Sequence, residues 1–426
     1  MQSSLPFLTS YDPSATSEGT LDPLGLYQIA DQLAVQLVPG VRERMQRIRF
    51  LTAMAVGALV TEGLEDNPEL RDASPYLVWE WLVVEALMRT KSEDPGLWGV
   101  PGTLVARRAL NLHGYLDARC YLKTPRIFGF HGVYKRLAMR LRIVDVHLHP
   151  GPNTEALVDA WARSVGFSDL NDAKPFLSRW TTEVRRCLRE RPPRTRPNWT
   201  NKDWNELAEA FAPYRCKFQE RRYLRKLLLD ERERRLGVLP TVWKLLSESK
   251  DELTEETLHD LLAQREPSNA ALLHAIRSYE AFARALQDAF DLLRAEATSM
   301  DARGFEIADI ANDADFIMCV KNLHERFATA YHALSEVTAP DLFDNRFGVF
   351  SEPLDAGACA LVLCKHHEDI QRAKSASGKR PWFDRMSERR IYIRHGYREK
   401  RRDIEPNRYV HDYRSRPIHN FFNDLT

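Results

Sequence analysis

With 426 residues, the chain is too long for one ordinary hydrophobic core, so the sequence predicts roughly two to four domains or subdomains. A hydrophobic fraction of 44% and a charged fraction of 28% are typical of folded globular proteins and exclude wholesale disorder. The formal net charge of +1 does not by itself indicate a nucleic-acid partner, so the distribution of charge carries the argument.

Hydrophobic periodicity predicts a helical unit over residues 1 to 99. Apolar residues recur at helical spacing from Leu24 to Leu37, and Pro39-Gly40 ends that helix. A second helix is predicted from about Val41 to Val60 with its arginines on the solvent side, and a third, largely buried helix from about Pro75 to Met88.

A winged-helix-like unit with following helices is predicted over residues 100 to 190. Helix candidates at 103 to 112 and 133 to 142 precede a short strand at 143 to 146 and a tip rich in Gly and Pro, which is the order helix, helix, strand, wing. Three prolines within residues 191 to 198 exclude a helix or a central strand, and we place a domain boundary there.

The second half of the sequence is predicted to be helical nearly throughout. Residues 200 to 354 form a helical domain with a hairpin of two long helices, from about Asn269 to Ala297 and from about Asp315 to Leu334. Residues 355 to 426 form a basic C-terminal region, with a helix to about Ala373 and a short β-hairpin near Trp382 and Ile391. The predicted fold class is therefore mainly α.

The predicted helix at 133 to 142 has a basic face that contains no acidic residue. At 100° per residue, apolar side chains share one arc, while Lys135, Arg136, Arg140 and Arg142 lie on the other. Such a face suits contact with a phosphate backbone, and these four residues are candidate nucleic-acid ligands. The alternative is a solvated face on a purely structural helix.

A second basic patch is predicted near the C-terminus. From Arg372 to Arg402 there are twelve Lys or Arg against three acidic residues, interleaved with aromatic rings. Cations neutralise phosphates and rings stack on bases, so the mixture favours nucleic acid. The alternative is a strand that docks a partner protein. The candidate contacts are Lys379, Arg380, Trp382, Arg394, Arg398 and Arg401.

The sequence offers two alternative metal sites. His147 and His149 follow Asp145 with the spacing of the first metal-binding strand of an amidohydrolase, but helices rather than alternating strand-helix units follow. Cys359, Cys364, His366 and His367 invite a zinc hypothesis, yet no second CxxC or CxxH knuckle completes a tetrahedral site. No nucleotide-binding motif is present, so we expect no metal and no cofactor, and favour a protein that is not an enzyme.

The cellular location follows from cysteine usage and hydropathy. The six cysteines form no CxxC pair, and the N-terminus lacks the charged and apolar segments of a secretory signal. The longest apolar run, residues 50 to 60, is about half as long as a bilayer requires. We therefore expect a cytoplasmic protein with reduced thiols and no membrane span.

Several short motifs together resemble accessory proteins encoded in bacterial phage-defence islands, beside ATPases, helicases or methyltransferases. The resemblance covers about a quarter of the chain and implies a cytoplasmic, non-enzymatic subunit of a multi-protein complex that acts on DNA. The motifs are Leu21-Asp-Pro-Leu-Gly-Leu26, Leu37-Val-Pro-Gly40, the arginine-rich residues 42 to 49, Phe128-Gly-Phe130, His367 and Lys379-Arg-Pro-Trp-Phe383.

Three functional hypotheses follow. The favoured one is a subunit that binds duplex DNA, or scaffolds a complex, in prokaryotic antiviral defence, with an ATPase or helicase as a partner. The second is a protein-protein adaptor that works through the acidic helical residues 249 to 335. The third is a metal-dependent hydrolase or nuclease that uses His147 and His149.

Overall fold

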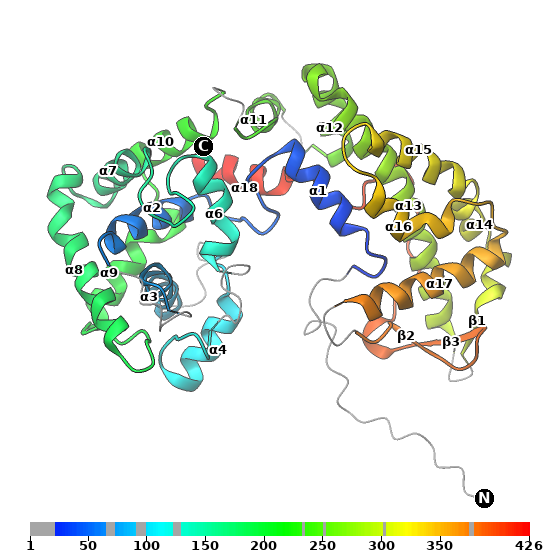
Figure 1. Ribbon diagram of the computed structural model, residues 1–426, viewed down its shortest axis with the longest axis horizontal. Coiled ribbons are helices and arrows are strands. Elements are labelled where there is room, and N and C mark those ends of the chain that lie inside the picture. Colours follow the sequence, from blue (N-terminus) through cyan, green and yellow to red (C-terminus); the bar gives the residue numbers. More distant parts are fainter. Residues whose placement is uncertain are drawn as a thin grey trace, which may run out of the picture. The chain divides into compact units, whose positions relative to one another are not determined.

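The computed structural model describes residues 22–64, 73–90, 99–121, 129–231, 235–249, 253–300, 304–374 and 379–426. It is mainly helical, as expected, and contains a small three-stranded antiparallel sheet where the sequence predicted a two-stranded hairpin (Figure 1). The chain forms two compact units, and each is discontinuous in sequence. Unit 1 contains the described residues before Ala34 and Thr254–Asp412, and unit 2 contains Ala34–Leu253 and Tyr413–Thr426. The four consecutive domains predicted from the sequence are therefore replaced by two interleaved units.

Unit 2 consists of helices and connecting turns in its described part. Its helices are the end of α1 (Tyr27–Leu37), α2 (Phe50–Thr61), α3 (Pro75–Arg89), α4 (Thr103–His113), α6 (Phe130–Arg140), α7 (Thr154–Val165), α8 (Leu170–Arg189), α9 (Asn201–Phe211), α10 (Phe218–Leu228), α11 (Leu239–Glu248) and α18 (Ser415–Leu425).

The core of unit 2 is built around α2 and α3, whose side chains are almost all buried. The indole of Trp79 lies against Gly57, where an added Cβ would come within 2.4 Å of the ring, so this close approach requires glycine. Trp79 donates from Nε1 to the carbonyl of Ala53 and packs against Trp180 and Phe211, with ring centroids 5.3 and 5.7 Å away. These aromatic contacts join α2, α3, α8 and α9.

The start of α2 differs from the prediction. Residues 41 to 49 form turns, because the Tyr134 hydroxyl accepts hydrogen bonds from the backbone N–H groups of Gln46 and Arg47, both at 3.1 Å. Arg49, expected on a solvent-facing side, is instead 1% exposed and pairs with Glu220. The hydrophobic period continues through Met45 and Ile48, which are buried without being helical.

The proline-rich residues 191 to 198 are part of unit 2 and not a domain boundary. Thr195 is 3% exposed, donates from its backbone N–H to the Leu116 carbonyl at 2.9 Å, and accepts from the Leu116 N–H at Oγ1 at 2.8 Å. Its hydroxyl also donates to the buried carboxylate of Glu85. The prolines exclude regular structure, but these polar contacts fix the segment against the core.

The winged-helix prediction is not confirmed. Helices α4 and α6 are present, but the expected strand and wing form one antiparallel bridge, between Val144 and Pro150. A tight turn occupies the tip, where Oδ1 of Asp145 accepts from the N–H groups of His147 and His149 at 2.7 and 2.9 Å. An aspartate that satisfies its own turn in this way competes with the ladder of a hairpin.

Unit 1 is organised around α13 (Ala270–Ser299), a 30-residue helix that packs along α15 (Leu323–Ser335). The sequence predicted this pair, but the second predicted helix is divided at Asn322, which has a left-handed φ of 58°. The other elements of the unit are α12 (Glu255–Arg265), α14 (Ala314–Val320), α16 (Asp341–Phe347), α17 (Ala356–Ala373), β1 (Phe305–Glu306), β2 (Phe383–Arg385) and β3 (Arg390–Ile393).

The predicted C-terminal hairpin is confirmed as the antiparallel pair of β2 and β3. Phe383 pairs with Ile393, and Arg385 with Ile391, so the apolar residues of β3 alternate toward the core. The sequence did not predict β1, in which Phe305 pairs with the free side of Ile391 and gives the strand order β1-β3-β2.

Candidate nucleic-acid interface

Helix α6 carries the predicted basic face. Its inner side is buried as the helical wheel required, whereas Arg136 and Arg140 are exposed and Lys135 is half-buried beside His131. Arg142 is exposed just beyond the helix, where the chain turns with a left-handed φ of 53°. Arg136 has no hydrogen bond or ion pair within the described residues.

A buried carboxylate holds the N-terminus of α6. Oε1 and Oε2 of Glu80 accept hydrogen bonds from the backbone N–H groups of Phe130 and His131 at 3.0 and 3.1 Å. These are N–H groups at the start of the helix, which have no acceptor within it. Glu80 is 1% exposed, and the loss of solvation outweighs both hydrogen bonds and raises its pKa to about 7.

The other end of α6 is held by Arg140. Its side chain crosses Gly40, where an added Cβ would lie 2.8 Å from the arginine Cδ and where φ is +90°, so the turn requires glycine. The guanidinium then donates from Nη1 to the carbonyl of Arg235 at 3.1 Å. This neutral acceptor orients the side chain without cancelling its charge.

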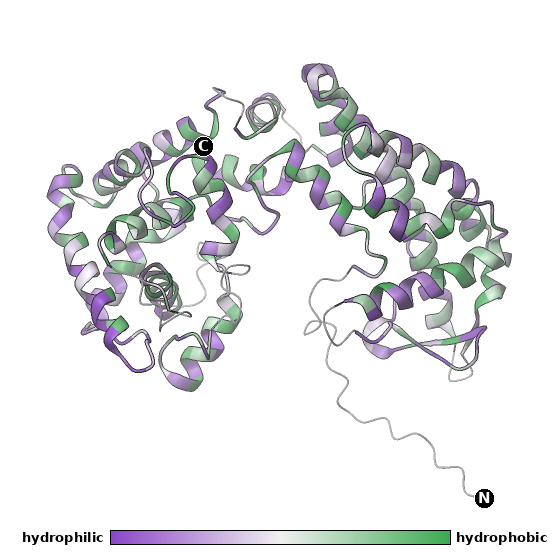
Figure 2. Cartoon of the chain, in the orientation of Figure 1, coloured by the Kyte–Doolittle hydropathy of each residue, from purple (hydrophilic) through white to green (hydrophobic). Residues whose placement is uncertain are grey.

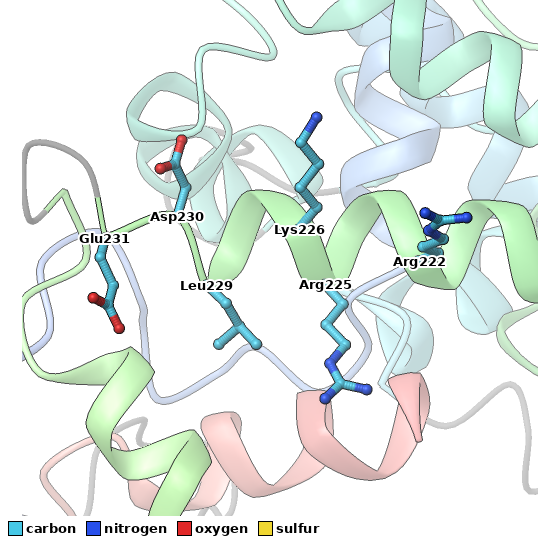
Figure 3. Close-up of a pocket in the computed structure, with 6 residues that line it drawn as sticks. All are labelled: Arg222, Arg225, Lys226, Leu229, Asp230 and Glu231. Carbon is cyan, nitrogen blue, oxygen red and sulfur yellow. The ribbon is translucent and has the colours of Figure 1, made fainter.

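Helix α10 provides a second basic face that contains no exposed acid. Its one acidic residue, Glu220, is fully buried, while Arg222, Arg225 and Lys226 are exposed. Lys226 points away from α18, whereas Arg225 points toward it (Figure 3). The ammonium of Lys226 lies 5.8 Å from the ring centroid of Tyr223.

Asn153 brings the two basic helices together. Its Nδ2 donates to the Leu141 carbonyl at the end of α6 at 2.8 Å, and its Oδ1 lies 3.5 Å from the hydroxyl of Tyr223 on α10. One short side chain therefore spans the gap between them. We call the exposed cations of both helices the α6–α10 surface: Arg136, Arg140, Arg142, Arg222 and Lys226.

An open, shallow hollow of about 530 Å³ adjoins this surface. Its lining is largely charged, which differs from the mostly apolar clefts that hold small molecules. With three cations and two carboxylates in its lining, the hollow does not resemble the binding site of a compact apolar substrate. It is lined by Arg222, Arg225, Lys226, Leu229, Asp230 and Glu231 (Figure 3).

The C-terminal basic patch is not the exposed surface that the sequence predicted. Trp382 is 6% exposed and stacks on Tyr397, with ring centroids 4.8 Å apart. Arg394 is 4% exposed and donates from Nη1 to the Pro381 carbonyl at 3.1 Å. Both residues flank the paired strands and are covered by other side chains of unit 1: Trp382 packs against Phe290 of α13, and Arg394 lies over the ring of Tyr397, so neither is available to a nucleic acid as predicted.

Several of the other cations of this patch form ion pairs or hydrogen bonds within unit 1. Arg401 lies within 2.9 Å of Glu296 and also pairs with Asp313 and Asp315, which raise its pKa. Arg380 pairs with Asp384 at 2.9 Å. Arg398 donates to the Tyr392 hydroxyl, and Lys379 is half-buried. The acids that neutralise Arg401 are remote in sequence, which is why a local count of charges missed them.

The metal alternatives gain no support from the described residues. His147 and His149 are exposed with ring centroids 5.9 Å apart, and His149 lies 3.4 Å from Asp145. Among the residues with a described structure, no three His, Cys, Asp or Glu side chains are grouped to hold a metal ion. The part of the chain that the structure describes is mainly helical and contains no strand-helix barrel of the amidohydrolase kind.

The residues of the zinc hypothesis have structural roles. His367 donates from Nδ1 to the Pro23 carbonyl at 2.9 Å and accepts from the Trp382 N–H at Nε2 at 3.0 Å, so both ring nitrogens are occupied. Burial lowers its pKa to about 3 and keeps it neutral. Burial also raises the thiol pKa of Cys359 and Cys364 to about 12, which makes them inert.

Sequence reasoning missed Arg222 and Lys226. The signal was present, because the stretch Phe218–Leu228 has four Lys or Arg and a single acid, as acid-poor as the α6 face. What the sequence could not supply is the partner of Glu220, since Arg49 lies 171 residues away. With that acid removed from the surface, α10 becomes a basic helix.

Comparison with known proteins identifies no family. No family model matches the chain, and no curated protein or solved structure is significantly similar to it. Within the described residues, no helix is both long enough and apolar enough to cross a bilayer.

Proposed function

We propose that this chain binds duplex DNA through the α6–α10 surface. The observation that carries the proposal is the meeting, at Asn153, of two helices whose exposed faces hold cations and no acid. Arg136 and Arg222 have no ion pair in the described structure that would have to break before they contact a phosphate. Phosphate contact from helix faces gives affinity without sequence preference.

The same account predicts the salt dependence of binding. Each Lys or Arg that neutralises a phosphate releases condensed counterions. If all five cations of the surface bind phosphates, a plot of the logarithm of the association constant against the logarithm of salt concentration has a slope of about −4 to −5. A protein that recognises an apolar partner has a much weaker dependence on salt.

The biological setting we propose is a non-enzymatic subunit of a prokaryotic antiviral defence complex, with an ATPase or helicase as a partner. This part of the proposal depends on the resemblance in short motifs described above. Of those motifs, Leu21 and Phe128 lie outside the described residues. Lys379-Arg-Pro-Trp-Phe383 forms the start of the C-terminal hairpin, and His367 anchors it.

Fluorescence anisotropy on a short random-sequence duplex tests the proposal. The charge reversals Arg136→Glu with Arg140→Glu, and Arg222→Glu with Lys226→Glu, should each weaken binding about tenfold or more. Arg380→Glu with Arg408→Glu is the matched control, because both arginines are exposed in unit 1 and paired with acids. Equal affinity of all four proteins, with unchanged circular dichroism, would reject the α6–α10 surface as a DNA site.

An adaptor is the second candidate, and α4 favours it. Leu104 and Leu112 are 82% and 67% exposed and lie about two turns apart, with exposed Arg108 between them. Helix α4 contains no acidic residue, so the matching partner surface is apolar with an acidic rim. Under this hypothesis the wild type does not bind duplex DNA directly, and Leu104→Ser with Leu112→Ser abolishes complex formation with the partner protein.

A further inference from the structure

The C-terminal half of α8 carries a third group of cations. Arg185, Arg186 and Arg189 are exposed and have no hydrogen bond or ion pair within the described residues. The helix buries Trp180, Val184 and Cys187, so the arginines between these positions are directed outward. Figure 2 shows hydrophilic residues recurring along α8.

The acids of this region are already occupied. Oε2 of Glu190 accepts from Arg194 at 2.9 Å and lies 3.8 Å from Arg196. Oε2 of Glu183 accepts from the backbone N–H of Asn198 at 2.8 Å. Within the described residues, none of the three arginines of α8 pairs with these acids.

A fourth cation extends the group. Nη1 of Arg191 donates to the carbonyls of Leu188 and Glu190 at 3.3 and 3.2 Å, which places the guanidinium over the end of α8. Carbonyls orient this group without neutralising it. We call these four residues the α8 patch: Arg185, Arg186, Arg189 and Arg191.

The α8 patch and the α6–α10 surface lie on different sides of unit 2. Helix α2 contacts both α6 and α8 and is buried along almost its whole length. In Figure 1, α8 forms the left edge of unit 2, α6 lies on the right of the same unit, and α2 and α3 lie between them. A duplex on one surface therefore leaves the other free.

The chemistry of the α8 patch fits phosphates better than a protein surface. All four cations are arginines, whose planar guanidinium groups bind phosphate oxygens with two parallel hydrogen bonds. No large exposed hydrophobic residue occurs within α8 or residues 190 to 198. A protein interface needs such residues at its centre.

We propose that the α8 patch is a second DNA-binding surface, through which one molecule bridges two duplex segments. This inference depends on the proposed function, since the first duplex occupies the α6–α10 surface. The patch offers guanidinium groups only, so the second contact is with the backbone and is independent of base sequence.

A capture assay tests the bridge. A biotinylated duplex is immobilised on beads with full-length protein, and retention of a free fluorescent duplex is measured. The variant replaces Arg185, Arg186 and Arg189 by Gln, which removes charge but keeps helix propensity. The matched control replaces Arg380, Arg402 and Arg408 by Gln, three exposed and paired arginines of unit 1.

The wild type and the control should retain equal amounts of the second duplex. The α8 variant should retain at least about fivefold less of it. Anisotropy with a single duplex should change no more than about threefold for the α8 variant, because the α6–α10 surface is intact. Full retention by the α8 variant would overturn the inference and assign bridging to association between protein molecules. The bridging inference is also overturned if the wild type binds one duplex and never retains a second. If the wild type binds no duplex at all, the proposed function itself is overturned.

Discussion

Arg49 and Glu220 form a buried ion pair with two parallel hydrogen bonds. Nε lies 3.1 Å from Oε1 and Nη2 lies 3.0 Å from Oε2, with exposed fractions of 1% and 0%. Arg49 also donates to the Ala212 carbonyl. The pair connects the turn before α2 with α10, so it holds one of the two basic helices in place and removes the only acid of α10 from the surface.

Breaking this pair should destabilise unit 2 strongly. Glu220→Gln leaves a buried guanidinium without its counter-charge, which costs about 3–5 kcal/mol, whereas Arg49→Met with Glu220→Met removes both charges and costs less than the single change. Tryptophan fluorescence during urea unfolding measures the effect, since Trp79, Trp161 and Trp180 all lie in the unit 2 core. A double variant less stable than Glu220→Gln contradicts this account.

Glu80 should make unit 2 less stable as pH rises. Its pKa is about 7 in the folded chain and about 4.5 as its ordinary value, so the folded state binds more protons between these pH values. The contribution of Glu80 is present below about pH 4.5 and is lost as pH rises through about 7, at most about 3 kcal/mol in all.

Glu80→Gln should flatten this dependence. Unfolding midpoints measured for both proteins at about pH 5 and about pH 8 give the comparison, and the wild type should lose more stability than the variant over that interval. Identical changes in the two proteins would show that the Glu80 carboxyl titrates normally.

His367 should give unit 1 the opposite response. Its pKa is about 3 in the folded chain, below the ordinary value of about 6.5. The contribution of the neutral ring to stability is therefore complete above about pH 6.5, and below that pH it falls by up to about 1.4 kcal/mol per pH unit. Burial is the largest cause, and Lys374, His366 and Arg294 add to it.

Hydrogen exchange at the Trp382 amide measures this loss, because that N–H donates to the ring of His367. Protection should decrease between about pH 6 and about pH 4 once intrinsic exchange rates are corrected, and it should be low at both values in His367→Ala. Protection that is constant in the wild type would contradict a neutral, buried histidine.

Arg401 should matter for stability and not for DNA binding. Arg401→Gln leaves Glu296, Asp313 and Asp315 close together without a cation, and we expect a loss of about 1–2 kcal/mol because the cluster is partly exposed. Its affinity for duplex DNA should stay within about twofold of the wild type. A tenfold loss of affinity with unchanged stability would restore the C-terminal patch as a DNA site.

Local features of the fold were predictable from the sequence. The apolar stripe of α13 predicts a helix, and the alternation around Ile391 predicts a strand, from neighbouring residues alone. The acid-free face of α6 is likewise visible in consecutive residues. The unpredicted features depend on remote partners. Arg401 meets acids 86 to 105 residues away, and Thr195 is buried by Leu116, so neither the neutralised patch nor the buried proline segment has a local signal.

The return of α18 to unit 2 has a consequence for synthesis on the ribosome. Asp424 accepts hydrogen bonds from Arg47 Nη1 at 2.7 Å and the Ile48 N–H at 3.2 Å, across 377 and 376 residues. Until translation reaches this helix, α10 and α11 lack the cover of α18, in which Phe422 packs against Trp243 of α11 with ring centroids 5.1 Å apart. The faces of α10 and α11 that α18 covers in the folded protein therefore stay exposed until this helix has been synthesised.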